Sequence, residues 1–277
     1  MNPKFLETRR SVRELYLPAF ELCEEAPEVI GQICGSFVRE QQRHGIARFL
    51  VAPSYWELHR PEERIGLISG LDGRDEIGPR LLLRFLERLA LDLEPPFNLL
   101  PIVYPVANPA GYEAGTQLPP GGADLNVENW ARCPQPEVTI LERELRSCHF
   151  QGLVLVQETD DDKPSVALHD TTLQFQRVLC ALSAAAGIAP ERVEFGGTLA
   201  EHGICAVFAD LPETPWLVSL RVPRAALHQE QIAEDTLNFL IAFLGFYARR
   251  QGHLPPGAGS LLNRSAKPST QALLSHA

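Results

Sequence analysis

Short apolar runs of strand type alternate with longer amphipathic segments along most of this chain, and this alternation limits the folds open to it. The strand-type runs lie at 47–53, 64–69, 98–106, 152–157, 206–208 and 216–222. Segments with helical periodicity lie at 76–91, 136–148, 172–186 and 228–250. Strands that alternate with helices predict an α/β fold, in which helices cover both faces of a sheet. In such sheets the functional crevice lies at the carboxyl ends of the strands.

The two ends of the chain differ from this pattern. Residues 11–42 show helical periodicity with charged faces, which predicts one or two helices there. Residues 251–277 are dominated by Pro, Gly, Ser and Lys at their start and predict a loose tail. No apolar run reaches the roughly 18 residues of a membrane helix, and 237–247 suits a core helix. We therefore expect a single domain over residues 1–250, with the helices of 11–42 packed on it.

Charge and cysteine usage restrict the partners and the compartment. Acidic residues outnumber basic ones by 35 to 25, a net charge of −10. Because phosphate binding needs a basic face, neither nucleic acid nor a membrane is expected as a partner. The N-terminal residues lack the apolar stretch of a signal peptide, and the six cysteines form no C-x-x-C pair. We expect a cytoplasmic protein with reduced thiols.

Three loop segments carry a resemblance to a known family. Residues 70–79 read GLDGRDEIGP, 108–112 read NPAGY and 122–126 read GADLN. In order, spacing and strand–helix context they resemble the H-x-x-E turn, the N-P-D-G-Y loop and the G-x-D-L-N-R segment of the zinc carboxypeptidases. That family includes amidohydrolases similar to succinylglutamate desuccinylase and aspartoacylase. The resemblance implies one domain with a mixed, mostly parallel sheet of about eight strands between helices.

The resemblance also locates a metal site and a catalytic base. The family's zinc ligands are a His and a Glu in the first turn and a later His, with one coordination position left open. The matching positions here hold Asp72 and Asp75, and the third falls at Gln157 or Glu158. The family's general-base Glu matches Arg221, which stays ionised and cannot accept a proton near neutral pH.

Most of the substrate-binding residues implied by the resemblance are also replaced. The family's Asp-Leu-Asn-Arg has become Asp-Leu-Asn-Val, so that only Asn126 matches. Asn108 and Tyr112 either line the pocket, or satisfy the backbone of the long loop through local hydrogen bonds.

These replacements predict a protein that keeps the pocket and has lost zinc, base and carboxylate clamp. We expect no cofactor, no catalysis, and a small peptide, an amino-acid derivative or a protein as the binding partner. We also expect Arg221 to lie between Asp72 and Asp75, where relatives hold zinc, since its planar fork suits two carboxylates.

Two other functions stay open at this point. Asp72, Asp75 and Glu158 would make an oxygen-rich site for Mg²⁺, Ca²⁺ or Mn²⁺, and the chain would then be an active carboxypeptidase or N-acyl amino acid amidohydrolase. Alternatively, Asp72 and Asp75 form a structural turn and a helix N-terminus, where carboxylates are favoured. A chain of that kind could serve as a structural or interaction subunit.

Overall fold

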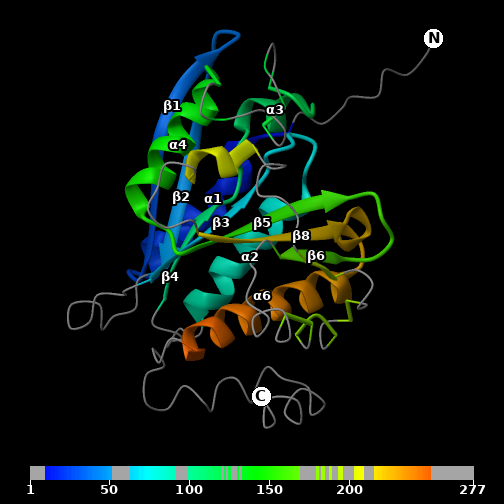
Figure 1. The fold of residues 1–277 in the computed structure, drawn as a ribbon. Coiled ribbons are helices and arrows are strands. Elements are labelled where there is room, and N and C mark those ends of the chain that lie inside the picture. The colour runs from blue at the N-terminus through cyan, green and yellow to red at the C-terminus, as the bar shows by residue number, and fades with distance from the viewer. Residues whose placement is uncertain are drawn as a thin grey trace.

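A mixed eight-stranded sheet forms the centre of the fold, as the computed structural model of the chain shows (Figure 1). The structure describes residues 10–51, 63–91, 99–119, 122, 124–125, 130, 133–168, 179–180, 182–184, 187–188, 193–195, 203–208 and 215–250.

The strand order is β1-β2-β4-β3-β5-β8-β6-β7. The four central strands β4, β3, β5 and β8 run parallel, whereas β1, β2 and β6 each join a neighbour in the antiparallel sense. This arrangement confirms the predicted mixed, mostly parallel α/β sheet. In chain order the strands are β1 (Val29–Arg39), β2 (Gln42–Val51), β3 (Glu63–Ser69), β4 (Leu99–Tyr104), β5 (Gly152–Thr159), β6 (Ser165–Leu168), β7 (Val193–Phe195) and β8 (Trp216–Pro223).

Helices cover both faces of the sheet and bury one apolar cluster on each. On one face, α1 (Val12–Glu25), α2 (Ile77–Leu91) and α6 (Glu230–Arg250) pack on alternate residues of the strands, and Figure 1 shows α2 and α6 close together. On the other face, α4 (Pro136–Cys148) and the 3₁₀ helix η5 (Gly203–Phe208) do the same. Successive strand residues point to opposite faces. The strands therefore read as nearly continuous apolar runs, as expected for a sheet buried on both sides.

The prediction of a helix over the second part of 11–42 is wrong. Only α1 is helical there, and residues Val29–Arg39 form β1, which pairs with β2 in a hairpin. Gly31 and Gly35 occupy positions on β1 where a Cβ would meet the rings and methyls of Phe49 and Ile140. At these two positions β1 therefore lacks the bulky apolar side chains whose alternation would predict a strand. The sequence does not indicate the hairpin turn either, because its two left-handed positions hold Glu40 and Gln41 and not Gly or Asn.

Two further segments differ from the expectation. Residues 206–208, expected as a strand, belong to η5. The loop expected over 108–129 contains a short helix, α3 (Pro109–Ala114), which Asn108 caps and Gly115 ends in the left-handed conformation. The expected tail at 251–277 and most of the expected helix at 172–186 lie outside the described residues.

No helix within the described ranges is both long enough and apolar enough to cross a bilayer. Residues 237–247 instead belong to α6, whose apolar residues pack on the sheet. The five cysteines whose side chains the structure describes are free thiols.

The contact between β5 and β8 provides a test of the packing. Gly152 on β5 lies opposite Trp216 on β8, and a Cβ at Gly152 would overlap the indole ring. That ring packs edge-on against Phe243 and Tyr247 of α6. We expect Gly152→Ala to lower the free energy of unfolding by about 1–3 kcal/mol, measured by urea denaturation, because the tryptophan must leave its packed position.

Gly45→Ala on β2 is the matched control. Its Cβ would meet the Cγ2 methyl of the exposed Ile33 side chain at 3.2 Å, a longer contact than the 2.0 Å at Gly152, so we expect a smaller loss. A Gly152→Ala protein as stable as the parent would contradict the position of Trp216.

Candidate functional site

A pocket of about 430 Å³ opens where the parallel strands β3, β5 and β8 end. It lies at the carboxyl edge of the sheet, where the α/β pattern predicts the functional crevice. Its wall consists of Leu71, Asp72, Arg74, Asp75, Gln157, Glu158, Thr159, Asp160, Arg221 and Arg224.

The turn after β3 forms one side of the pocket. Gly70 has a left-handed φ of 62° and lies against the backbone of Val106, 3.1 Å from where a Cβ would stand. The carboxylate of Asp72 accepts hydrogen bonds from the backbone N–H of Arg74 at 2.8 Å and from its guanidinium at 2.7 and 3.1 Å. Asp72 is therefore bound to its own turn, as the structural interpretation predicts.

Asp75 is buried at the start of α2. Its side chain accepts the backbone N–H of Gly78 at 2.8 Å and so caps the helix. Burial raises the pKa of the Asp75 carboxyl from 3.8 to about 7; backbone N–H groups, Gly78 first, act against the rise, and the nearby charge of Glu158 adds to it. The pocket wall thus contains a carboxyl group that carries a proton over much of the range below neutral pH.

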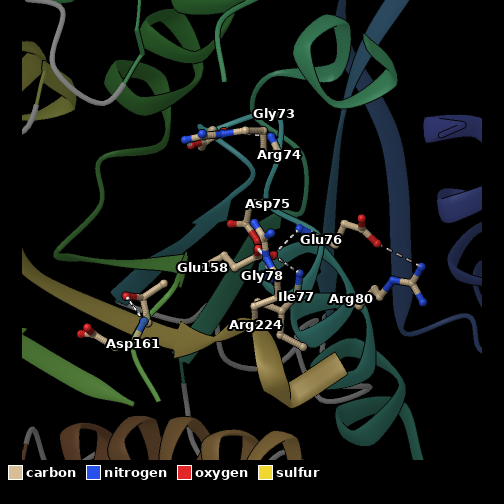
Figure 2. Close-up of polar contacts among 12 residues, drawn as sticks. Gly73, Arg74, Asp75, Glu76, Ile77, Gly78, Arg80, Glu158, Asp161 and Arg224 are labelled. Carbon is tan, nitrogen blue, oxygen red and sulfur yellow. Dashed lines mark hydrogen bonds and ion pairs between the residues drawn. The ribbon is translucent and has the colours of Figure 1, made fainter. Parts of the chain in front are cut away.

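Glu158, at the end of β5, reaches the same helix terminus. Figure 2 shows its carboxylate beside the first residues of α2, where one oxygen accepts the backbone N–H groups of Glu76 at 2.9 Å and Ile77 at 3.3 Å. The other oxygen pairs with the guanidinium of Arg224. These are N–H groups that a helix leaves without an internal partner, and the helix dipole favours a negative charge there.

The expected Asp72–Arg221–Asp75 cluster is wrong in its pairing. Arg221 lines the pocket, but no ion pair joins it to Asp72, Asp75 or any other residue that the structure describes. The reason is the alternation of β8. Arg221 lies opposite Gln157 and shares its face of the sheet, whereas Glu158 and α2 belong to the other face.

Arg224, and not Arg221, is the arginine near the end of β8 that pairs with a pocket carboxylate, and its partner is Glu158. Arg224 lies in the 3₁₀ helix η6 (Arg224–Leu227), directly after Pro223 ends β8. From beyond the strand end its guanidinium reaches the carboxylate of Glu158 (Figure 2). A charged residue immediately after the proline that ends a predicted strand is the sequence signal that could indicate this pair.

The residues at the family's ligand positions do not fit zinc. Asp72 and Glu158 use both of their carboxylate oxygens on donors of their own chain, and Asp75 is 4% exposed. Among the described residues, no group of three His, Cys, Asp or Glu side chains is placed to hold a metal ion. Zinc sites in proteins are built mainly from imidazole and thiolate ligands with free lone pairs, which this wall does not offer.

Two of the predicted substrate residues, Asn108 and Tyr112, are buried and do not line the pocket. Asn108 is fully buried; its amide nitrogen donates to the carbonyls of Leu71 and Gln117 at 3.3 Å each, and its oxygen accepts from Gly111 N–H at 2.8 Å. Tyr112 is also buried and is absent from the pocket wall. Asn108 thus has the backbone-satisfying role that the sequence analysis left open as an alternative. Asn126 lies outside the described residues.

Comparison with solved structures agrees with the sequence resemblance. A metallo-carboxypeptidase from Burkholderia cenocepacia superposes with a TM-score of 0.64 at 13% identity, over 86% of this chain and 70% of that one. Bovine thrombin-activatable fibrinolysis inhibitor, solved in complex with tick carboxypeptidase inhibitor, gives 0.62 at 15% identity, over 88% and 98%. No family model and no curated protein sequence matches the chain. These similarities confirm that the chain has the zinc-carboxypeptidase fold.

The buried position of Asp75 predicts a particular pH dependence. Because its pKa is raised on folding, the folded protein holds this proton more tightly. The stability that Asp75 contributes is therefore greatest below pH 4 and is lost as the pH rises through about 7. We expect the difference in unfolding free energy between the parent and Asp75→Asn to fall across this window by up to about 1.4 kcal/mol per pH unit. Urea denaturation at a series of pH values measures it.

Asp72→Asn is the control, because it removes a partly exposed carboxylate from the same turn. A parent-minus-Asp75→Asn difference that stays level from pH 4 to pH 8 would mean that Asp75 is ionised in the folded protein throughout.

Proposed function

We propose that this chain is a binding protein built on the zinc-carboxypeptidase fold, which holds a ligand in its pocket without zinc and without peptidase activity. The observation that supports this proposal most is the position of Glu158. Its carboxylate is engaged by two N–H groups of α2 and by Arg224, at one of the places where relatives need a metal ligand. The oxygen that accepts two N–H groups would have to give up a donor to bind an ion, because its two lone pairs are in use.

The loss of the base supports the same conclusion. Metal-dependent hydrolysis needs an ion that activates water and a group that accepts the proton of that water. The position implied for the base holds Arg221, a permanent cation. The proposal therefore rests on two independent replacements, one in the ligand set and one in the proton acceptor.

The pocket itself supports a retained binding role. Its volume of about 430 Å³ falls within the range of small-molecule sites, roughly 300–1,000 Å³. A small peptide or an amino-acid derivative is the ligand we propose, with the end of a protein partner as the larger alternative. A cytoplasmic location is part of the same proposal and rests on the sequence expectation of reduced thiols.

Metal content and turnover test the proposal together. The full chain is purified without chelator in buffer that contains zinc, its metal content is measured by mass spectrometry, and hydrolysis of C-terminal peptide substrates and of N-acyl amino acids is followed. We expect zinc far below stoichiometric amounts and no turnover. A thermal-shift screen of small peptides and amino-acid derivatives should still find compounds that raise Tm, because a ligand of the folded state stabilises it.

Arg221→Glu provides the matched variant, since it restores a carboxylate at the position of the base. We expect this variant to remain inactive, because the ligand positions stay engaged. Stoichiometric zinc together with chelator-sensitive hydrolysis by the parent protein would overturn the proposal and favour the active metalloenzyme.

A further inference from the structure

Three arginines line the pocket, and the structure separates one of them from the other two. The guanidinium of Arg74 is bound by Asp72, and that of Arg224 is bound by Glu158. Arg221 is half-buried in the same wall and has no hydrogen-bond or ion-pair partner among the residues that the structure describes. A guanidinium offers five N–H donors and always carries its charge. The pocket therefore contains one cation whose donors are not used by the fold.

The alternation of side chains along β8 explains why the pocket carboxylates form no ion pair with Arg221. Its neighbours across the sheet are Gln157 on β5 and Ser165 on β6, both uncharged. Asp75 and Glu158 are held at the start of α2, on the opposite side of the sheet. No carboxylate therefore stands directly beside Arg221 on its own face of these strands.

Asp160 is the remaining acidic residue of the wall, and it forms no ion pair with Arg221. It is exposed, and its negative charge acts on Arg74 and Arg224, whose pKa values it helps to raise after the larger effects of Asp72 and Glu158. Among the described residues of the wall, Arg221 is thus the one guanidinium that no carboxylate engages.

We propose that Arg221 is the anion-recognition residue of the pocket, and that the ligand presents an oxyanion, a carboxylate or a phosphate, to its guanidinium. This inference rests on the proposed binding function and gives that function a ligand class. The planar fork of arginine donates two parallel hydrogen bonds to such a group, which lysine cannot do. The anion binds near the end of β8, at the position where the resemblance implies a proton acceptor. With Arg221 at that position, the site binds an anionic group.

Titration with simple anions tests this assignment. Sodium succinate and potassium phosphate are the probes, each compared with sodium chloride at equal ionic strength, and affinity is measured by calorimetry and by the rise in Tm of the full chain. We expect at least one probe to bind the parent and to bind Arg221→Gln about tenfold more weakly or worse, the loss of a charge-assisted hydrogen bond. Arg221→Lys should recover part of the affinity, because it keeps the charge and loses the fork. Binding should weaken as salt is added.

Two controls keep the result interpretable. Arg88→Gln removes an exposed arginine of α2 that lies outside the pocket wall, and it should leave affinity unchanged. Unliganded Arg221→Gln should keep the Tm of the parent, because Arg221 has no described partner in the fold. Preference for succinate or for phosphate then identifies the source of the oxyanion.

The inference fails if neither anion stabilises the parent beyond chloride, or if Arg221→Gln binds as tightly as the parent. Its failure is distinct from failure of the proposed function. A zinc-free, inactive protein that ignores both anions removes only the role of Arg221, whereas stoichiometric zinc with hydrolysis removes the proposed function even if Arg221 binds anions.

Discussion

The carboxylate of Glu158 at the start of α2 is the interaction on which the rest of the site depends. It joins the end of β5 to the N–H groups of Glu76 and Ile77, and through Arg224 it joins both to the segment after β8. Two strand ends and one helix terminus are therefore fixed relative to one another by a single side chain that is 7% exposed. Each backbone N–H left without this partner would cost about 1–3 kcal/mol. The pocket floor is held by charge and hydrogen bonds within the chain.

Three carboxyl groups of the pocket wall are satisfied within the chain, each in a different way. Asp72 pairs with Arg74, Glu158 pairs with Arg224, and burial raises the pKa of Asp75 so that it holds a proton up to about pH 7. Among the described residues of the wall, Arg221 and the exposed Asp160 are the charged groups that no ion pair engages.

The sequence predicted the helices and central strands well, because their signals are local. The apolar positions of α2 recur every three or four residues, and α4 begins at a proline and ends as its periodicity predicts. β1 was not predictable in the same way, because Gly31 and Gly35 make room for side chains of other elements, and the glycines themselves show no alternation. Such close contacts depend on partners that are distant in the sequence.

The site was predictable in its location and less so in its pairing. The motif matches brought Asp72, Asp75, Glu158 and Arg221 to one pocket, and the structure places all four in its wall. They did not show that Arg221 would lie on the opposite face of the sheet from Glu158, nor that Arg224, beyond the end of β8, would pair with Glu158. Strand register decides which face of the sheet Arg221 occupies, because a shift of one residue would move its side chain to the other face.

Anomalous diffraction at the zinc edge, from crystals of the full chain grown with zinc, shows whether the ligand positions bind the ion. We expect no anomalous peak between Asp72, Asp75 and Glu158, with the Glu158 carboxylate bound to the N–H groups of Glu76 and Ile77 at about 2.9 and 3.3 Å. A zinc peak among these side chains, with Glu158 turned away from α2 toward the ion, would contradict this expectation.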